Sequence, residues 1–213
     1  MRCATLLTVA LMAGGLAQGQ SWSRDYYRNH VSAGLGFALP GRDLKTYYQA
    51  APAWSFGYGY RPVKYLQLDL GLDGAYNAAR VRDYLDVPGL GYLRIRDFQM
   101  FLPLGGRVVA PLARGRVEFY GGGGAAYART AEFLRQPSDY LRVDCPDCVA
   151  RDGWGYYALL GGSVALDRAQ HFRLGVTTRV YRMNTSGPPV GTTPAVNTSD
   201  QWVNTYFGFT FSF

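Results

Sequence analysis

The sequence predicts an all-β protein, folded as a closed, eight-stranded, antiparallel, transmembrane up-and-down β-barrel. Eight segments alternate between apolar and polar residues with a period of two, which is typical of strands that bury one face. The connections between them alternate between short and long. Of the 213 residues, 48% are hydrophobic and only 17% are charged, against roughly a quarter charged in soluble domains. This composition excludes a disordered chain and a small disulfide-stapled protein.

The first nineteen residues are predicted to be a cleaved signal peptide, so that 20–213 form the barrel. Met1 and Arg2 precede an apolar run over 4–17, which is too short to span a bilayer. Cleavage is expected after Ala17 or Gly19, and a buried helix of the mature domain is the alternative. Removal of Arg2 lowers the formal net charge of +7 by one. We therefore expect an exported protein.

The first four strand segments each place their larger apolar residues on one face. Arg28–Leu39 alternates through Val31, Ala33, Leu35 and Phe37; Ala53–Tyr60 through Trp54, Phe56, Tyr58 and Tyr60; Tyr65–Tyr76 through Leu66, Leu68, Leu70 and Leu72; and Arg96–Ala110 through Phe98, Met100, Leu102, Leu104, Val108 and Ala110. Pro103 interrupts the last of these, and we expect a β-bulge there or a position near the rim of the barrel.

The last four segments repeat the pattern, most clearly at the C-terminus. Arg116–Arg129 alternates through Val117, Phe119, Ala125 and Tyr127; Trp154–Leu166 through Tyr156, Ala158, Leu160, Val164 and Leu166; His171–Tyr181 through Phe172, Leu174, Val176 and Val180; and Gln201–Phe213 through Val203, Phe207, Phe209, Phe211 and Phe213. Short turns are predicted at 61–64, 111–115 and 167–170, and long connections at 40–49, 77–95, 130–153 and 183–200. An even strand number then places the short turns and both termini at one end.

The polar face of these segments carries acidic and basic residues that we expect inside the barrel. An eight-stranded barrel has room inside for side chains only, so the bulky apolar rows are expected to face lipid. A secreted carrier barrel with the opposite orientation is the alternative. Buried ions must be paired, which predicts a lumen charge network. Its predicted members are Asp69, Asp73, Arg107, Glu118, Arg173 and Arg179.

Other candidate sites are weaker. Cys145 and Cys148 form a Cys-Pro-Asp-Cys motif, which in an exported protein favours a local disulfide over a redox or zinc site. His30 and His171 are the two histidines, and each begins a strand, where an interfacial aromatic role is expected. The sequence therefore predicts no enzyme activity, no metal and no cofactor. It has no basic run, so nucleic-acid binding is not expected.

The C-terminal sequence Phe207-Gly208-Phe209-Thr210-Phe211-Ser212-Phe213, after seven earlier strands and a leader, resembles the small outer-membrane β-barrel proteins of Gram-negative bacteria, the OmpA/OmpX/OmpW-like group. The resemblance covers about residues 20–213. It implies an outer-membrane location, with outer-membrane lipid, lipopolysaccharide, the assembly machinery and periplasmic chaperones as partners. It also implies that Phe207, Phe209, Phe211 and Phe213 form the assembly signal.

Two functions remain open from the sequence. The first is a structural or surface-recognition barrel that meets an extracellular ligand through its long loops. Residues 130–153, with five acidic and three basic residues, are the candidate recognition loop, and Arg80, Arg82 and Arg94 are candidate contacts to lipopolysaccharide phosphates. The second is a narrow small-solute channel, porin-like, gated by exchange of the lumen charge pairs.

Overall fold

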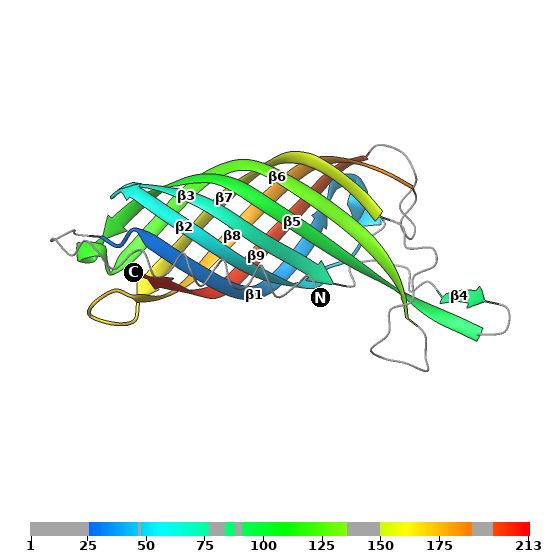
Figure 1. Cartoon of the computed structure of the whole chain (residues 1–213), viewed down its shortest axis with the longest axis horizontal. Helices are drawn as coiled ribbons and strands as arrows, with labels where there is room; N and C mark the ends of the chain where they lie inside the picture. Colours follow the sequence, from blue (N-terminus) through cyan, green and yellow to red (C-terminus); the bar gives the residue numbers. More distant parts are fainter. Residues whose placement is uncertain (1–25, 47, 77–83, 88–90, 136–149, 189–197) are drawn as a thin grey trace, which may run out of the picture.

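The computed structural model describes residues 26–46, 48–76, 84–87, 91–135, 150–188 and 198–213. These form nine strands and two short 3-10 helices (Figure 1). The strands are β1 (Asn29–Gly41), β2 (Ala51–Val63), β3 (Leu66–Tyr76), β4 (Tyr84–Val87), β5 (Gly91–Leu112), β6 (Val117–Arg135), β7 (Ala150–Ala165), β8 (Phe172–Ser186) and β9 (Thr198–Ser212), and the helices are η1 (Arg42–Thr46) and η2 (Ala113–Gly115). None of the described helices is long and apolar enough to cross a membrane.

Eight of the strands close into a ring in which every neighbouring pair is antiparallel. The order β3-β2-β1-β9-β8-β7-β6-β5 is closed by pairing of β3 with β5. The first and last strands pair along their length, from His30 with Ser212 to Gly41 with Gln201. Closure leaves no ring strand with a free edge, which satisfies the requirement that backbone groups in hydrocarbon be paired within the protein. The predicted fold class is confirmed.

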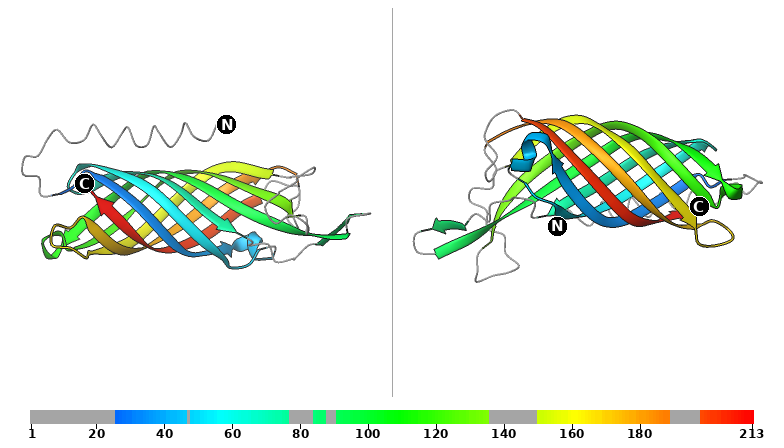
Figure 2. Two further views of the ribbon diagram at one scale, coloured as in Figure 1. Left: turned by 60° about the horizontal axis from the view of Figure 1, so that its bottom comes forward. Right: turned by 180° about the vertical axis from the view of Figure 1, so that it is seen from behind.

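The strand β4 lies outside the ring, within the long connection predicted at 77–95. Among the described residues it pairs with the start of β5, from Tyr84 with Arg94 to Val87 with Gly91. The β3–β5 ladder stops at Tyr76 and Phe98, whereas β5 and β6 stay paired as far as Arg94 and Arg135. Together β4, β5 and β6 project beyond the ring as a ribbon (Figures 1 and 2).

The strands β5 and β6 are longer than predicted, with 22 and 19 residues. The predicted start of β5 at residue 96 was too late because the apolar residues change phase there. The apolar residues Phe98, Met100, Leu102 and Leu104 occupy even positions, whereas Leu93 and Ile95 occupy odd positions. Such a change ends an alternating pattern without ending the strand.

The short turns lie together at one end of the barrel, which we call the short-turn end. The chain enters β1 and leaves β9 there (Figure 1), where the backbone N–H of Asn29 donates to the carbonyl of Phe213 over 3.0 Å. The turn predicted at 61–64 is wrong in part, because β2 continues to Val63 and includes Arg61. The pairing of β2 with β3 shifts register between Tyr60 and Val63.

Pro103 corrects a second expectation, since it lies in mid-strand with no bulge and not at the rim. Its ring points inward and is fully buried. Pairing of β5 with β3 stops after Leu104 and resumes at Phe101 in the same register. Gly71 leaves the space for the ring, because a Cβ there would lie 2.9 Å from Cγ of Pro103.

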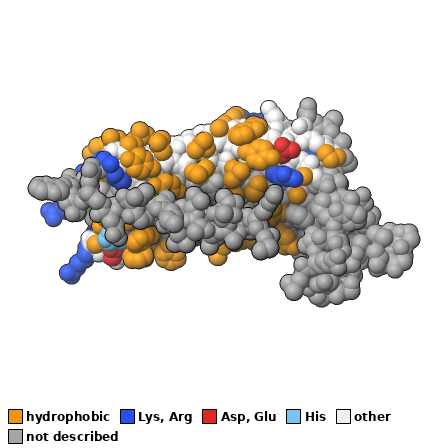
Figure 3. Space-filling view, viewed as in Figure 1, with side chains coloured by type: hydrophobic (Ala, Val, Ile, Leu, Met, Phe, Trp, Pro, Cys, Tyr) orange, Lys and Arg blue, Asp and Glu red, His pale blue; other side chains and the backbone are white. Residues whose placement is uncertain are grey.

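The apolar faces of the strands point outward, as predicted. Leu35 and Leu160 are each more than 70% exposed, and the terminal phenylalanines 207, 209, 211 and 213 are exposed as well. Figure 3 shows hydrophobic side chains spread over the barrel wall. Such a surface is incompatible with water but suits the hydrocarbon of a bilayer.

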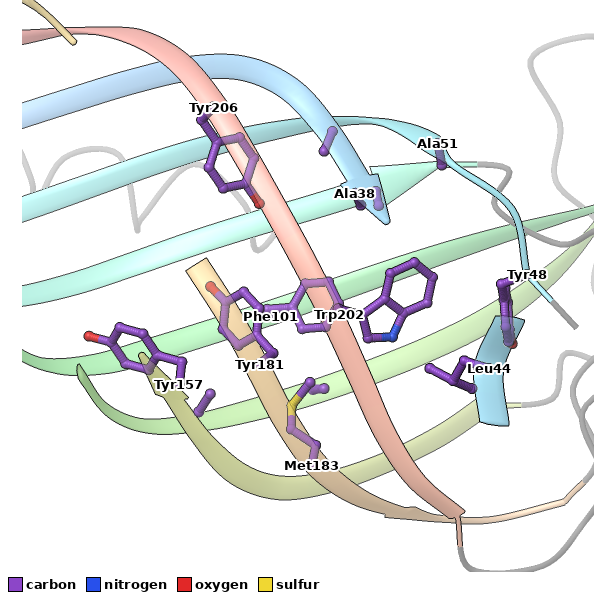
Figure 4. Packing of buried hydrophobic residues seen from close by; sticks show 14 of the residues in the cluster. Ala38, Leu44, Tyr48, Ala51, Phe101, Tyr157, Tyr181, Met183, Trp202 and Tyr206 are labelled. Carbon is purple, nitrogen blue, oxygen red and sulfur yellow. The ribbon is translucent and has the colours of Figure 1, made fainter. Parts of the chain in front are cut away.

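The interior also contains large aromatic side chains, which were not predicted from the sequence. They form a layer in the half of the lumen away from the short-turn end (Figure 4). Phe101 stacks on Tyr181 with ring centroids 4.7 Å apart and meets the edge of Trp202 at 6.1 Å. Tyr157 lies 5.8 Å from Tyr181. We call Phe101, Tyr157, Tyr181, Trp202 and Tyr206 the aromatic layer.

Candidate functional site

The six predicted lumen charges all project into the barrel, from four different strands. Asp69 and Asp73 come from β3, Arg107 from β5, Glu118 from β6, and Arg173 and Arg179 from β8. Strict alternation explains this placement, because residues two or four apart on a strand share one face. All but Arg107 are buried, and the side chain of Arg107 is only 13% exposed.

Glu118 binds two arginines near the short-turn end. Nη1 and Nη2 of Arg61 donate to its two carboxylate oxygens over 3.0 and 3.3 Å. Nε of Arg173 lies 3.4 Å from Oε2 of Glu118, and Nη2 of Arg173 donates to the carbonyl of Gly115 over 2.6 Å. One carboxylate thus joins β2, β6 and β8 across the lumen.

Asp69 forms a two-pronged pair with Arg107. Nε and Nη2 of the guanidinium donate to the two carboxylate oxygens over 2.5 and 2.8 Å, a geometry that favours arginine over lysine. Gln67 connects this pair to the first, since it accepts from Arg61 over 3.1 Å and donates to Asp69 over 2.8 Å. The guanidinium of Arg107 also lies 4.7 Å from the ring centre of Tyr120.

Asp73 and Arg179 form a third pair beside the aromatic layer. Asp73 is completely buried and pairs with Nη1 of Arg179. Tyr181 donates its hydroxyl proton to the other carboxylate oxygen over 2.6 Å, and Arg179 also donates to Oγ of Ser55 over 3.0 Å. This pair therefore anchors a ring of the aromatic layer as well as a charge.

Arg61 is a charged member of the network that was not predicted from the sequence. It continues the inward positions Ser55, Gly57 and Gly59 by one more step, so the period of two contained the signal. Pro62 led us to predict a turn instead. The aromatic layer could have been found in the same way, because Tyr157, Tyr181 and Trp202 occupy the inward parity of their strands.

The histidines differ from one another. His30 is not an interfacial aromatic residue, because it points inward, is buried, and hydrogen-bonds to Oγ of Ser212 over 2.8 Å. Its polar ring is accommodated by this partner on the adjacent strand. His171 lies at the rim, packed on Tyr27 with centroids 4.5 Å apart and hydrogen-bonded to the carbonyl of Ser212 over 2.7 Å.

Several predicted features fall where the structure gives no description. Cys145, Cys148, Arg80 and Arg82 lie outside the described residues, as does the predicted leader, and the side chain of Arg94 is not described. Within the described part of the chain, no group of three or more His, Cys, Asp and Glu side chains could hold a metal ion.

The lumen is filled with side chains rather than open. Around the charge network it contains cavities of about 40 and 50 Å³, and a water molecule needs roughly 10–15 Å³ on the same measure. A wider vestibule of about 590 Å³ opens at the short-turn end, lined by Arg61, Glu118 and residues of the turns. The aromatic layer and the ion pairs lie between this vestibule and the opposite end.

Fold and lumen together define a small, closed β-barrel of the outer-membrane type. Among solved structures the chain is similar to the Neisserial surface protein A, NspA, with a TM-score of 0.55 and 14% identity over 87% of this chain and 97% of that one. It is also similar to the outer membrane protein OprG of Pseudomonas aeruginosa, with a TM-score of 0.53 and 16% identity over 88% of this chain and 97% of that one.

A third similar structure is Ail, the attachment invasion locus protein of Yersinia pestis, with a TM-score of 0.51 and 11% identity over 88% of this chain and 99% of that one. No family model matches the sequence, and no curated protein matches it. At these identities the likeness establishes the fold, that of the eight-stranded outer-membrane barrels.

Proposed function

We propose that the protein is an integral outer-membrane barrel with a closed lumen, which serves as a rigid scaffold for surface recognition. Residues 1–19 are its cleaved leader in this proposal. The phenylalanines 207, 209, 211 and 213 form the signal that the assembly machinery reads, with periplasmic chaperones delivering the chain. Lipid and lipopolysaccharide surround the wall.

The observation that carries the proposal is the packing of the lumen. Three carboxylates each bind at least one arginine across the barrel, and the aromatic layer lies beside the third pair. Because the cavities that the described residues form between these groups have room for only a few waters, we infer that the lumen admits no solute. A filled barrel acts as a support for what it carries at its ends.

The unequal ends of the barrel support the orientation. Turns at the short-turn end are compact, whereas β4, β5 and β6 extend past the ring at the opposite end (Figure 2). In outer-membrane barrels the short turns face the periplasm and the long connections face outward. Long connections on a rigid support commonly carry binding functions, so the extracellular ligand is proposed to bind there, with residues 130–153 included.

A small-solute channel is the competing function, and one experiment separates the two. Purified protein is reconstituted into liposomes for swelling assays and into planar bilayers for single-channel recording, with an open porin as the positive control. The proposal predicts no solute uptake and silent traces for wild type, for Arg107→Ala and for Glu118→Ala. Steady conductance of wild type, altered by either substitution, would establish the channel.

Location and orientation need a separate test. Membrane fractionation and the heat-dependent gel mobility of the barrel locate the protein, and protease treatment of intact cells reports which end is exposed. Cleavage confined to the long connections is expected. Cleavage at the short turns in intact cells would invert the orientation.

A further inference from the structure

A small cavity within the charge network is lined by four arginines. The cavity of about 40 Å³ lies in the short-turn half of the lumen. Four guanidiniums line it, from Arg61, Arg107, Arg173 and Arg179, but only two carboxylates, from Asp69 and Glu118. Because Arg179 pairs with Asp73 deeper in the barrel, three guanidiniums share two carboxylates around this cavity.

The three guanidiniums and two carboxylates around the cavity therefore have a net charge of +1. His30, which also lines it, adds no negative charge. A charge out of contact with bulk water is costly unless it is paired. Arg61 and Arg173 both use the same carboxylate, Glu118, so neither has an anionic partner of its own.

Two of these guanidiniums also retain an unused donor. Nε of Arg61 and Nε of Arg179 are buried without a hydrogen-bond partner among the described residues. Both side chains are more than nine-tenths buried, and guanidinium nitrogens can only donate. Buried donors of this kind are normally satisfied, so a missing acceptor is implied.

The size and access of the cavity restrict what that acceptor can be. Its volume has room for roughly three waters, which admits a monatomic anion and excludes a large organic one. Arg61, Glu118 and His30 line both this cavity and the vestibule of about 590 Å³ at the short-turn end. An ion can therefore enter from that end without passing the aromatic layer.

We propose that the cavity binds one chloride ion, held by the guanidiniums of Arg61, Arg107 and Arg173. The bound ion neutralises the excess charge and accepts the hydrogen bond that Nε of Arg61 leaves unused. The site stabilises the folded barrel and requires neither transport through it nor a particular orientation in the membrane, so it is independent of the proposed function.

The test is thermal unfolding of the purified, detergent-solubilised barrel, followed by heat-dependent gel mobility, in potassium chloride against potassium gluconate at equal ionic strength. A ligand that binds only the folded state lowers the unfolding equilibrium constant by a factor of one plus its concentration over its Kd, about tenfold at ten times the Kd. We expect chloride and bromide to raise the unfolding temperature saturably, and gluconate to leave it unchanged.

Two lumen variants and one surface variant make the test specific. Arg61→Gln balances the charge and is expected to abolish the chloride effect, whereas Glu118→Gln increases the excess and is expected to strengthen it. Arg168→Gln, in an exposed turn, is expected to keep the wild-type effect. If Glu118→Gln does not fold in gluconate, chloride-dependent refolding replaces the unfolding measurement.

Three results decide whether chloride binds in this cavity. Equal unfolding temperatures in chloride and gluconate would show that the cavity holds water only. A chloride effect that survives Arg61→Gln would place the ion elsewhere. Anomalous scattering from bromide in crystals gives a direct check, and a bromide peak among the three guanidiniums is the expected result.

Discussion

Removal of the carboxylate of Asp73 should be among the most destabilising conservative changes in this barrel. Asp73→Asn preserves the shape of the side chain and can still accept the hydroxyl proton of Tyr181. It leaves the guanidinium of Arg179, which is buried beside Asp73, without its counter-charge. Loss of one partner of a buried ion pair costs about 3–5 kcal/mol. At roughly 2–4 °C per kcal/mol for a chain of this size, the unfolding temperature falls by about 6–20 °C.

The assay is reversible denaturant unfolding in lipid vesicles, carried out as a double-mutant cycle. Arg179→Met removes the orphaned charge, so Asp73→Asn combined with Arg179→Met should be more stable than Asp73→Asn alone by about 2 kcal/mol or more. If Asp73→Asn lowers the free energy of unfolding by less than about 1 kcal/mol and the two substitutions are additive, the ions behave as solvated ions do. That result would refute both the buried pair and the closed lumen.

Four further predictions concern the layers of the barrel. Phe101→Ala should cost about 3–5 kcal/mol in denaturant unfolding and admit small solutes in liposome swelling. Leu160→Arg, on the lipid face, should cost about 2–4 kcal/mol in vesicles. Gly124→Val should prevent folding, as seen by gel mobility, because a Cβ there would lie 2.2 Å from a backbone oxygen of β5. The backbone N–H of Phe172 is the main cause that lowers the pKa of Asp167. At neutral pH the ionised carboxylate should therefore make the wild type more stable than Asp167→Asn. In unfolding measurements this difference should disappear as the pH falls through the lowered pKa.

Each of these four has an outcome that contradicts it. A Phe101→Ala barrel that stays impermeable would show that the ion pairs close the lumen by themselves. An unchanged Leu160→Arg would mean that this face does not meet lipid. A Gly124→Val barrel that folds would contradict the steric argument, and Gly121→Ala, whose Cβ would approach no atom closer than 3.6 Å, is the control that is expected to fold. If wild type and Asp167→Asn differ in stability by the same amount at pH 7 and pH 2, the ionised carboxylate of Asp167 does not cause the difference.

The sequence was sufficient to predict the ring and the direction in which its faces point. A period of two places Leu66 and Asp69 on opposite faces whatever the tertiary structure, and the narrow bore then decides which face is inside. Strand ends were less predictable, because pairing of β5 with β6 continues beyond the ring, where the apolar pattern changes phase. Pro103 was misplaced because its accommodation depends on a glycine of a different strand, Gly71.

The partners within the charge network could be predicted only as a set. Which arginine meets which carboxylate depends on the register of strands far apart in the chain, such as Arg61 with Glu118, 57 residues away. Aromatic side chains on the inward face were also not predicted. The expected inward side chains were the charged ones, whereas the buried cluster also contains the aromatic layer.

Pairing of β1 with β9 has a consequence for how the molecule can be made. These two strands join the N-terminal and C-terminal parts of the described chain along twelve residue pairs, so the cylinder exists only when its final hairpin is in place. A product lacking β9 would expose the unpaired backbone of β1 and β8 to hydrocarbon, where nothing can substitute for the lost hydrogen bonds. Closure of the ring therefore requires β9, and an intermediate that lacks this strand keeps an open seam of unpaired backbone groups.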